Sequence, residues 1–395
     1  MKQDLQLDPP RRSAEAADRR PPDVDRPPTV CHLLHSLNVG GAEVLVARIA
    51  RRLSSRYRFV FACLDELGPL GEQLRDEGFV VDVLGRKPGL DLGCARRLSR
   101  FLRSHGVEVL HAHQYTPFFY ALVSRIFRRY PPVLFTEHGR WHPDYPRRKR
   151  IVFNRIFLRR NDHVVGVGEA VRQALINNEG ISAERVKVIY NGVNSTDFSG
   201  DGRSDARRAL GIGDRDDVVI QVARLDALKD HFTALRAIER LTAARPTLQL
   251  LLVGEGPERL AIEAEIVSRG LQSHVRLLGL RSDVAQLLSA ADAFLLSSVS
   301  EGIPVTVIEA MLAELPVVAT RVGGMGEVVE SEVTGFLAAA GDDATLAESL
   351  DRLLSNESLR RQMGQAGRQR ATQLFSEQQM HESYAQLYQE MLSVK

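Results

Sequence analysis

The sequence has few cysteines, no long apolar run and no apolar leader, and each absence excludes a class of protein. Its three cysteines, Cys31, Cys63 and Cys94, are odd in number and lack the spacing of a metal site, so a reducing compartment is the simplest interpretation. No apolar run approaches the roughly 18 residues that span a bilayer. Residues 1–28 are polar, charged and rich in proline, without the apolar segment of a signal peptide. We therefore expect a cytoplasmic protein with a disordered tail through residue 28.

The charge of the chain is unevenly distributed. Residues 1–200 hold 32 Lys and Arg against 22 Asp and Glu, a net charge of +10, and the remainder holds 20 against 28, a net charge of −8. This asymmetry indicates an anionic partner for the first half. The whole chain carries only +2, and we expect no nucleic-acid partner. At 395 residues it is long for one hydrophobic core, which predicts two domains.

Short β-branched runs separated by helical stretches predict parallel α/β units. In the first half such runs lie at residues 107–113, 133–138, 163–168 and 186–192. The polar residues 192–217, rich in Gly and Asp, then predict a linker between domains, and a second α/β series follows. The chain ends in an amphipathic helix that begins with the capping box of Ser376 and Gln379.

Residues 297–327 carry the pattern on which the functional hypothesis depends. An apolar strand ends in the loop Glu301-Gly302, Pro304 opens a helix, the strand PVVAT follows, and a Gly-Gly loop closes the stretch. Proline suits a first helical position because its missing N–H would have no partner there. The amides from Gly302 to Thr306 therefore predict an anion site at the front of the helix, typical of a phosphorylated ligand.

Glu309 lies five residues after Pro304, or about 7 to 8 Å along the helix axis. This distance suits the ribose of a nucleotide whose diphosphate binds at the helix front. A solvated helix carboxylate would explain the same residue. Its apolar neighbours favour the binding role, because a carboxylate among apolar side chains is costly unless it accepts hydrogen bonds. Glu301 lies on the other side of the phosphate position, where a sugar would bind.

Two cations, Arg224 and Lys229, follow the expected strand at 217–223. Beyond a strand end they suit a diphosphate, since Arg offers a planar fork of donors and Lys a point charge. The pair precedes the two glutamates along the chain, so both groups would belong to the second domain.

The order of these motifs resembles the donor site of the retaining glycosyltransferases of family 4. The similarity rests on Glu-Gly-(aliphatic)-Pro with a second Glu eight positions after the first, then PVVAT and Gly-Gly, and it covers the chain from about residue 30 onward. It implies the GT-B fold, an α/β architecture of two Rossmann-like domains with parallel sheets facing across a cleft. The acceptor domain would span 29–200 and the donor domain 201–375, and a last helix, 376–395, would pack back on the first domain.

The resemblance also implies roles for residues of this chain. Arg224 and Lys229 would clamp the pyrophosphate, Glu301 would hold sugar hydroxyls, and Glu309 would hold the ribose. Further donor contacts would come from residues that line the cleft: Gly40, Gly41, Gly254, Arg281 beside the base, and the helix front of Gly302, Ile303, Pro304, Val305 and Thr306.

Two glycine pairs stand where a strand passes into a loop or helix. Gly40 and Gly41 could form a tight turn there as well as approach a ligand. Gly254 and Gly256 match the start of a dinucleotide motif, but Arg259 replaces its third glycine and no acidic ribose ligand follows. An oxidoreductase is therefore disfavoured.

Histidines mark the ends of two expected strands. His111 would point inward and be structural, and His113, at the strand exit, would contact the transferred sugar according to the resemblance. His138 and Glu137 would lie on the acceptor side, although a hydrogen-bonded core histidine would also explain His138. A His-x-His pair can bind a metal, but no third ligand follows at a suitable spacing, and we expect no metal.

Residues 147–160 combine seven basic residues with a set of apolar ones: Ile151, Phe153, Ile156, Phe157 and Leu158. A basic amphipathic helix can lie on an anionic membrane. It can equally pack its apolar face on its own domain, and the sequence leaves both interpretations open.

We expect this protein to transfer a hexose-type sugar from a UDP- or GDP-sugar to an acceptor hydroxyl, with retention at the anomeric carbon and without a cofactor. The acceptor would be a glycan, a lipid-linked glycan or an exopolysaccharide precursor, and the enzyme would be cytoplasmic or peripheral on the membrane. The alternatives are a nucleotide-sugar 2-epimerase of the same fold and a non-catalytic nucleotide-sugar binding protein. Gly326, Tyr190 and Gly168 depart from the family pattern, which leaves the acceptor details open.

Overall fold

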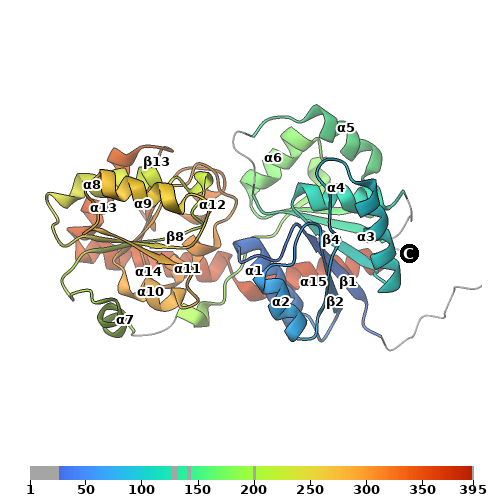
Figure 1. The fold of residues 1–395 in the computed structure, drawn as a ribbon, viewed down its shortest axis with the longest axis horizontal. Helices are drawn as coiled ribbons and strands as arrows, with labels where there is room; N and C mark the ends of the chain where they lie inside the picture. The colour runs from blue at the N-terminus through green and yellow to red at the C-terminus, as the bar shows by residue number, and fades with distance from the viewer. Residues whose placement is uncertain (1–25, 127–130, 140–143, 199–201, 394–395) are drawn as a thin grey trace, which may run out of the picture.

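The computed structural model describes residues 26–126, 131–139, 144–198 and 202–393. The chain forms two lobes, each built on a parallel β-sheet with helices on both faces (Figure 1). The predicted α/β architecture of two Rossmann-like domains is therefore confirmed. The expected tail at residues 1–28 falls almost entirely outside the described residues.

The first domain contains a seven-stranded parallel sheet in the order β3-β2-β1-β4-β5-β6-β7. Its short strands are buried because helices cover both faces, which explains their runs of Val, Leu and Phe. The three cysteines lie buried here as free thiols. In chain order the elements are β1 (Thr29–Leu34), α1 (Gly41–Arg52), β2 (Arg58–Cys63), α2 (Pro69–Asp76), β3 (Val80–Val83), α3 (Leu92–Ser104), β4 (Val109–His113), α4 (Tyr115–Ser124), β5 (Val133–Glu137), α5 (Arg148–Phe157), β6 (His163–Gly166), α6 (Glu169–Glu179) and β7 (Val186–Val188).

The second domain contains a six-stranded parallel sheet in the order β10-β9-β8-β11-β12-β13. Loops that follow strands of both sheets face the junction between the two domains (Figure 1). The elements are α7 (Arg203–Leu210), β8 (Val218–Val222), the 3₁₀ turn η3 (Ala227–Lys229), α8 (His231–Thr242), β9 (Gln249–Val253), α9 (Arg259–Ser268), β10 (Val275–Gly279), α10 (Val284–Ala290), β11 (Ala293–Leu296), α11 (Val305–Leu312), β12 (Val317–Thr320), α12 (Met325–Val328), β13 (Gly335–Ala338), α13 (Asp343–Leu354) and α14 (Glu357–Leu374).

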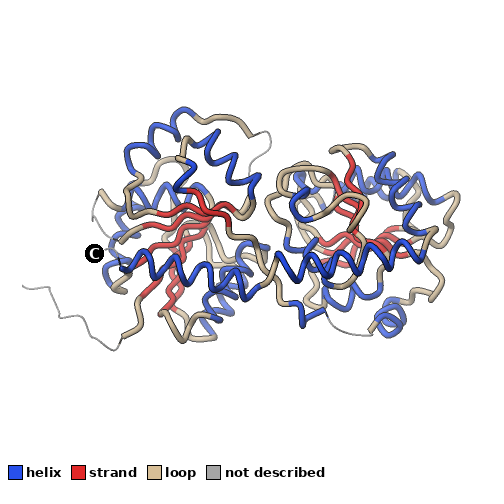
Figure 2. Tube along the Cα trace, turned by 180° about the vertical axis from the view of Figure 1, so that it is seen from behind, coloured by secondary structure: helices blue, strands red, loops and turns tan. Residues whose placement is uncertain are grey.

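Helix α15 (Glu377–Ser393) crosses back from the second domain and packs on the first, as expected (Figure 2). The backbone N–H of Gln379 lies 3.4 Å from the hydroxyl of Ser376, which matches the predicted cap. On the first domain, the hydroxyl of Tyr57 donates to the carbonyl of Ala385 at 3.0 Å. The buried face of α15 consists of Met380, His381, Tyr384, Ala385, Leu387, Tyr388 and Met391.

The predicted linker at residues 192–217 is partly wrong. Helix α7 lies within it and packs on the second domain. Arg207 of this helix is buried, and its guanidinium donates to Asp292 at 2.9 Å and to the carbonyl of Ala290 at 3.0 Å. The polar sequence concealed this packing because an arginine occupies the core position. The predicted domain boundary at residue 200 lies outside the described residues.

Helix α5 divides its apolar residues between two sides. Phe153 packs against Phe119 at a ring-centroid distance of 4.7 Å, and Phe157 stacks on Phe153 at 4.5 Å. Val152 and Ile156 are 56% and 68% exposed. The helix therefore packs on its own domain and also presents apolar side chains to solvent. Within the described parts of the chain, none of the helices combines the length and the apolar character needed to cross a bilayer.

A buried ion pair joins three elements of the first domain. The guanidinium of Arg125, at the end of α4, bonds both carboxylate oxygens of Asp162 at 2.8 and 2.5 Å. Asp162 also accepts the backbone N–H groups of Val133, on β5, and Arg159, before β6. Because both charges are buried, each depends on the other for solvation.

Replacing Arg125 with Met leaves Asp162 as a buried carboxylate without its cation. We expect Arg125→Met to lower the free energy of unfolding by about 3–5 kcal/mol, measured by urea denaturation followed by far-UV circular dichroism. Arg155→Met, on the exposed side of α5, is the matched control and should change it by less than about 0.5 kcal/mol. Equal stability of the two variants would contradict this role.

Candidate functional site

The front of α11 lies where the two domains meet. The helix begins at Val305, and Pro304 is its N-cap with an extended backbone (φ −73°, ψ 116°), so the predicted start at Pro304 is wrong by one residue. A Cβ on Gly302 would overlap the carbonyl oxygen of His138, so the loop before α11 packs directly on the first domain. The first amides of a helix have no partner inside it, and those of Val305 and Thr306 therefore suit an anion.

Lys229 and Glu301 form an ion pair beside this helix front. The Lys229 Nζ lies 2.6 Å from Oε1 of Glu301, and the hydroxyl of Ser298 donates to the same oxygen at 2.6 Å. The Glu301 side chain is only 7% exposed and that of Lys229 24%. Charge-assisted bonds in such shielded surroundings hold the ammonium in place before a ligand binds. The structure thus brings both residues next to Gly302, while their role in donor binding stays a prediction.

Arg224 follows β8 and reaches toward the first domain. Its side chain is 70% exposed and lies 3.6 Å from Asp226. Burial raises the pKa of Glu43, in the first turn of α1, and the charge of Arg224 opposes the rise. The guanidinium therefore acts across the junction on a carboxylate of the other domain, and it remains largely open to solvent.

Gly254 and Gly256 have a structural role at the base of the Arg224 loop. A Cβ on Gly254 would overlap the carbonyl oxygen of Ala223, and one on Gly256 would overlap that of Leu225. Gly254 also has a φ of +144°, which side chains rarely adopt. The pair lets the end of β9 pack against the backbone on both sides of Arg224. The donor contact expected of Gly254 stays a prediction.

Glu309 occupies a partly buried position on α11 near a cation of the first domain. Burial raises the pKa of its carboxyl to about 7, the charge of Arg48 on α1 opposes the rise, and that of Asp197 adds to it. The carboxyl therefore exchanges its proton near neutral pH. Sequence reasoning found Glu309 but missed Arg48, because only the packing of α1 against the second domain brings the two charges together.

The glycines before α1 lie close to the front of α11. A Cβ on Gly41 would be 3.9 Å from the side chain of Val305, and Gly40 is the N-cap of α1. The side-chain amide of Asn191 fixes the loop before α11 by donating to the carbonyl of Ile303 at 2.7 Å. The structure therefore brings Gly40, Gly41 and the helix front together at the junction.

Glu327, which sequence reasoning missed, connects the domains through a helix end. It accepts hydrogen bonds from the backbone amides of Glu169 and Ala170 at 2.7 and 2.8 Å and from the hydroxyl of Tyr190 at 3.0 Å. The two amides open α6, whose N-cap, Gly168, has no side chain to bind them. A carboxylate at a helix N-terminus is stabilised by the unpaired amides and the helix dipole. The second domain thus caps a helix of the first.

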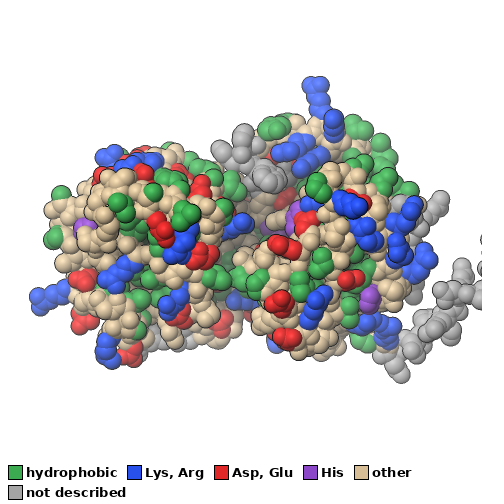
Figure 3. All heavy atoms as spheres, viewed as in Figure 1, with side chains coloured by type: hydrophobic (Ala, Val, Ile, Leu, Met, Phe, Trp, Pro, Cys, Tyr) green, Lys and Arg blue, Asp and Glu red, His purple; other side chains and the backbone are tan. Residues whose placement is uncertain are grey.

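His113 is the centre of a chain of three histidines. Its Nε2 lies 2.9 Å from Nδ1 of His32, and its Nδ1 lies 3.0 Å from Nε2 of His138. Burial lowers the pKa of His32 to about 3 and that of His138 to about 4, and it places the pKa of His113 well below its ordinary value. The rings are therefore neutral at physiological pH. Histidine side chains reach the surface at the hollow between the lobes (Figure 3).

His111 lies beside His113, at a ring-centroid distance of 4.1 Å, and its hydrogen bonds are those expected of a structural residue. It bonds the hydroxyls of Tyr388 and Thr136, each at 2.8 Å. Nitrogens of His32, His111 and His113 lie within 4.8 Å of one another. Sequence spacing alone therefore missed a third histidine, since His32 lies 81 residues before His113 and reaches it only through the pairing of β1 with β4.

Arg281 lies in the exposed loop after β10, at one edge of the second sheet. Its guanidinium makes two hydrogen bonds to Asp283, at 2.8 and 2.5 Å. The pairing holds the side chain within its own loop. The contact with a base that the resemblance implies for Arg281 stays a prediction.

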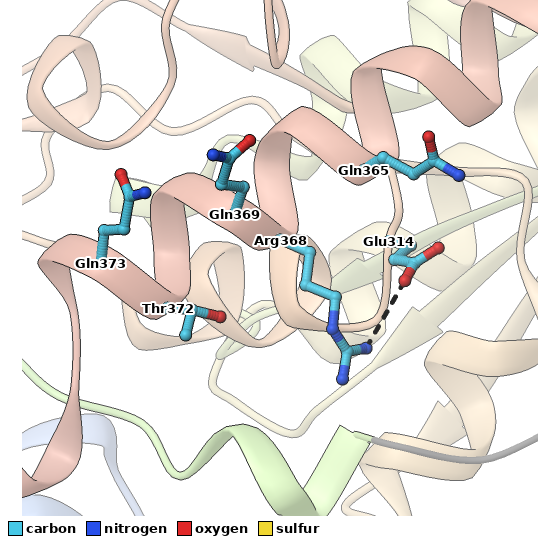
Figure 4. Close-up of a pocket in the computed structure, with 6 residues that line it drawn as sticks. All are labelled: Glu314, Gln365, Arg368, Gln369, Thr372 and Gln373. Carbon is cyan, nitrogen blue, oxygen red and sulfur yellow. Dashed lines mark ion pairs between the residues drawn. The ribbon is translucent and has the colours of Figure 1, made fainter.

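A polar groove of about 350 Å³ lies elsewhere, along α14 (Figure 4). Gln365, Gln369 and Gln373 project from one side of this helix, and Arg368 faces Glu314 at 3.7 Å. Arg368 also donates to the carbonyl of Leu312 at the end of α11. Arg368 therefore links α14 to the end of α11 through a side-chain ion pair and a backbone carbonyl.

Comparison with known proteins agrees with this arrangement. The family profile for glycosyl transferases group 1 matches residues 202–370, and the profile for glycosyltransferase family 4 matches residues 39–197. The chain belongs to the group 1 glycosyltransferases of family 4. The family 4 profile covers most of the first domain of this glycosyltransferase, and the group 1 profile covers most of the second.

Alignments with individual relatives and solved structures cover most of this glycosyltransferase chain. N-acetyl-alpha-D-glucosaminyl L-malate synthase of Bacillus anthracis is 25% identical over 77% of this chain and 80% of its own length. The putative glycosyltransferase EpsF of Bacillus subtilis (strain 168) is 28% identical over 73% of this chain and 77% of its own. The crystal structure of Anabaena Alr3699/HepE in complex with UDP-glucose has a TM-score of 0.81 at 24% identity, covering 91% of this chain and 99% of that one. At that identity the structural likeness shows the shared GT-B fold.

The raised pKa of Glu309 predicts a pH-dependent stability. Because the folded state holds the proton with a pKa of about 7 against an ordinary 4.5, stability should fall as pH rises between these values and level off above pH 7. Relative to wild type, Glu309→Gln should match at pH 4.5 and be more stable at pH 8, by about 1–3 kcal/mol. Urea denaturation at both pH values measures this difference. A difference that does not change with pH would contradict the burial of Glu309.

Proposed function

We propose that this glycosyltransferase moves a hexose-type sugar from a nucleoside diphosphate sugar to an acceptor hydroxyl, with retention at the anomeric carbon. The observation that carries the proposal is the Lys229–Glu301 pair at the front of α11. It brings a shielded cation from the loop after β8 next to a carboxylate and the first amides at the front of α11, and each of these groups suits a different part of a sugar diphosphate.

In the proposed complex the diphosphate lies against the amides of Val305 and Thr306, between Lys229 and Arg224. The ribose binds Glu309, about one and a half turns along the helix. The sugar then lies at Glu301, whose carboxylate accepts hydrogen bonds from the sugar hydroxyls. The same carboxylate also accepts the hydrogen bond from Lys229. On the opposite wall the ring of His113 faces the sugar or the positive charge that develops at its anomeric carbon, without donating a hydrogen bond, because both its nitrogens are bonded to His32 and His138.

Departure of the diphosphate builds negative charge on the leaving oxygen. Preorganised cations and amides stabilise that charge without reorganising at the moment of reaction. In the proposal the acceptor oxygen attacks the face from which the diphosphate leaves, forming the new glycosidic bond as the old one breaks, and the acceptor's proton passes to the departing phosphate. The protein's own cations supply the positive charge, so the proposal needs no metal cofactor and no protein base.

Two of the comparisons guide the choice of nucleotide base and acceptor in this proposal. The Anabaena structure holds UDP-glucose, which favours a UDP-sugar over a GDP-sugar as donor here. We propose a glycan, a lipid-linked glycan or an exopolysaccharide precursor as acceptor. The Bacillus anthracis relative is named instead for L-malate, and a small hydroxy acid is therefore the comparison substrate in an acceptor screen.

Donor binding and turnover test the proposal together. UDP-glucose should raise the melting temperature, because a ligand that binds only the folded state stabilises it. Lys229→Ala should lower kcat by about 10²–10³ with the fold intact. The matched control is Lys187→Ala, which removes a surface ion pair with Glu390 on the first domain and should leave kcat unchanged. Proton NMR of the product reads the anomeric configuration.

Three outcomes would overturn the proposal. Absence of a thermal shift with UDP-, GDP- and ADP-sugars would contradict the donor site. A product with the opposite anomeric configuration to the donor would contradict the retaining mechanism. A 2-epimer formed from the nucleotide sugar without any acceptor would identify an epimerase.

We further propose that the outer side of α5 binds an anionic membrane, which would place the site near a lipid-linked acceptor. The exposed Val152 and Ile156 lie among the exposed basic residues Arg148, Lys149 and Arg155. Apolar side chains flanked by cations suit the boundary between acyl chains and anionic headgroups.

The double variant Val152→Ser/Ile156→Ser should weaken binding to vesicles that contain phosphatidylglycerol by at least about tenfold, because two aliphatic side chains no longer enter the acyl region. Cosedimentation measures the binding. The control, Leu260→Ser/Val267→Ser, removes equally exposed apolar side chains from α9 of the second domain and should bind as wild type does. Equal binding of both double variants, or equal binding to neutral vesicles, would contradict the proposal.

A further inference from the structure

The rings of His32, His113 and His138 form one hydrogen-bonded chain with two unpartnered ends. His113 uses both ring nitrogens, one toward each neighbour, at 2.9 and 3.0 Å. Among the residues that the structure describes, Nε2 of His32 and Nδ1 of His138 are buried and have no hydrogen-bond partner. One end of the chain lies within the first domain, and the other lies where the backbone of His138 touches Gly302.

The protons on the three rings are coupled. A neutral imidazole has one N–H donor and one bare acceptor nitrogen, so each ring that donates to one neighbour must accept from the other. Only two arrangements satisfy both bonds. Either every ring carries its proton on Nδ1 and His138 ends the chain with an N–H, or every ring carries it on Nε2 and His32 ends the chain with an N–H.

The surroundings of the two ends decide between these arrangements. The ring of His32 is fully buried and stacks on Phe59 and Phe61 at centroid distances of 5.3 and 5.6 Å. His138 is only partly buried and lies at the junction with Gly302. An orphaned buried N–H is rarer and costlier than a bare acceptor. The arrangement with the bare acceptor nitrogen at His32 therefore fits better, and it leaves at His138 an N–H whose buried Nδ1 has no hydrogen-bond partner among the described residues.

We infer that His32 is a positioning residue for the transfer reaction. It donates to His113 and thereby fixes His138 as a neutral N–H donor to an oxygen of the bound sugar or acceptor. The inference rests on the proposed function, since the ligand is a carbohydrate hydroxyl or ring oxygen of that reaction. It adds a buried residue without ligand contact to the site, and it makes the histidine chain a donor, not a base.

A metal ion is the competing occupant of this cluster. The nitrogens of His32, His111 and His113 lie within 4.8 Å of one another, but an ion bound through Nδ1 of His32 or Nε2 of His113 would break the hydrogen bond between them. His111 would also have to give up its hydrogen bonds to Tyr388 and Thr136. The chain of neutral rings needs no such rearrangement.

Two variants of nearly equal size separate positioning from packing. His32→Asn keeps a donor near the Nδ1 position, whereas His32→Leu keeps only the volume. With UDP-glucose as donor, we expect His32→Leu to lose about tenfold in kcat, the effect of one hydrogen bond. Its KM for the donor should change by less than about twofold. His32→Asn should recover kcat to within about threefold of wild type. Tyr388→Phe, which removes one hydrogen bond of His111 and none of the three-histidine chain, should leave kcat unchanged.

Nitrogen-15 NMR of histidine-labelled protein at neutral pH reads the protons directly. The expected result is Nδ1–H and bare Nε2 on all three rings in wild type, with His113 changed in His32→Leu and retained in His32→Asn. Equal losses in both His32 variants, a doubly protonated His113, or a Zn²⁺-dependent shift of the three rings would overturn the inference. If wild type transferred no sugar, the proposed function would fail, and the tautomers in the unliganded protein would still decide whether the chain exists.

Discussion

The ion pair of Lys229 with Glu301 is the interaction on which the candidate site depends. It joins the loop after β8 to the loop before α11, so two separate strand ends of one sheet become a single charged surface. Each partner compensates the desolvation cost of the other's charge, so the lysine ammonium is stable in a shielded position in the unliganded protein. The donor site that we propose from the amides of α11, Arg224 and Glu309 depends on this pair at its centre.

The junction between the domains is the second constraint. Gly302 packs on the backbone of His138, Asn191 bonds the carbonyl of Ile303, and Glu327 caps α6. These contacts set the front of α11 against the end of β5, where the histidine chain lies. Any motion that separates the domains must break polar bonds made with backbone groups, and those groups would otherwise need water.

Much of the fold followed from local patterns in the sequence. The runs predicted at 133–138 and 163–168 contain β5 and β6, because buried parallel strands need continuous β-branched and apolar residues. The prediction failed where polar residues were buried. Arg207 fills a core position in a stretch taken for linker. A separate error concerns the start of α11, where Pro304 is the N-cap and not the first helical residue because its ψ of 116° is extended.

The sequence by itself determined the two α/β domains, the α11 motif and the cations after β8, since periodicity and motif order are local properties of the chain. Only the tertiary structure decided that Lys229 binds Glu301 and that Glu327 reaches backbone amides 158 and 157 residues away in the sequence. It also decided that His32 forms a hydrogen bond with His113, 81 residues later in the sequence. The physical reason is that a side-chain hydrogen bond depends on which strands are neighbours. Strand order and domain contact are fixed by the packing of the whole molecule.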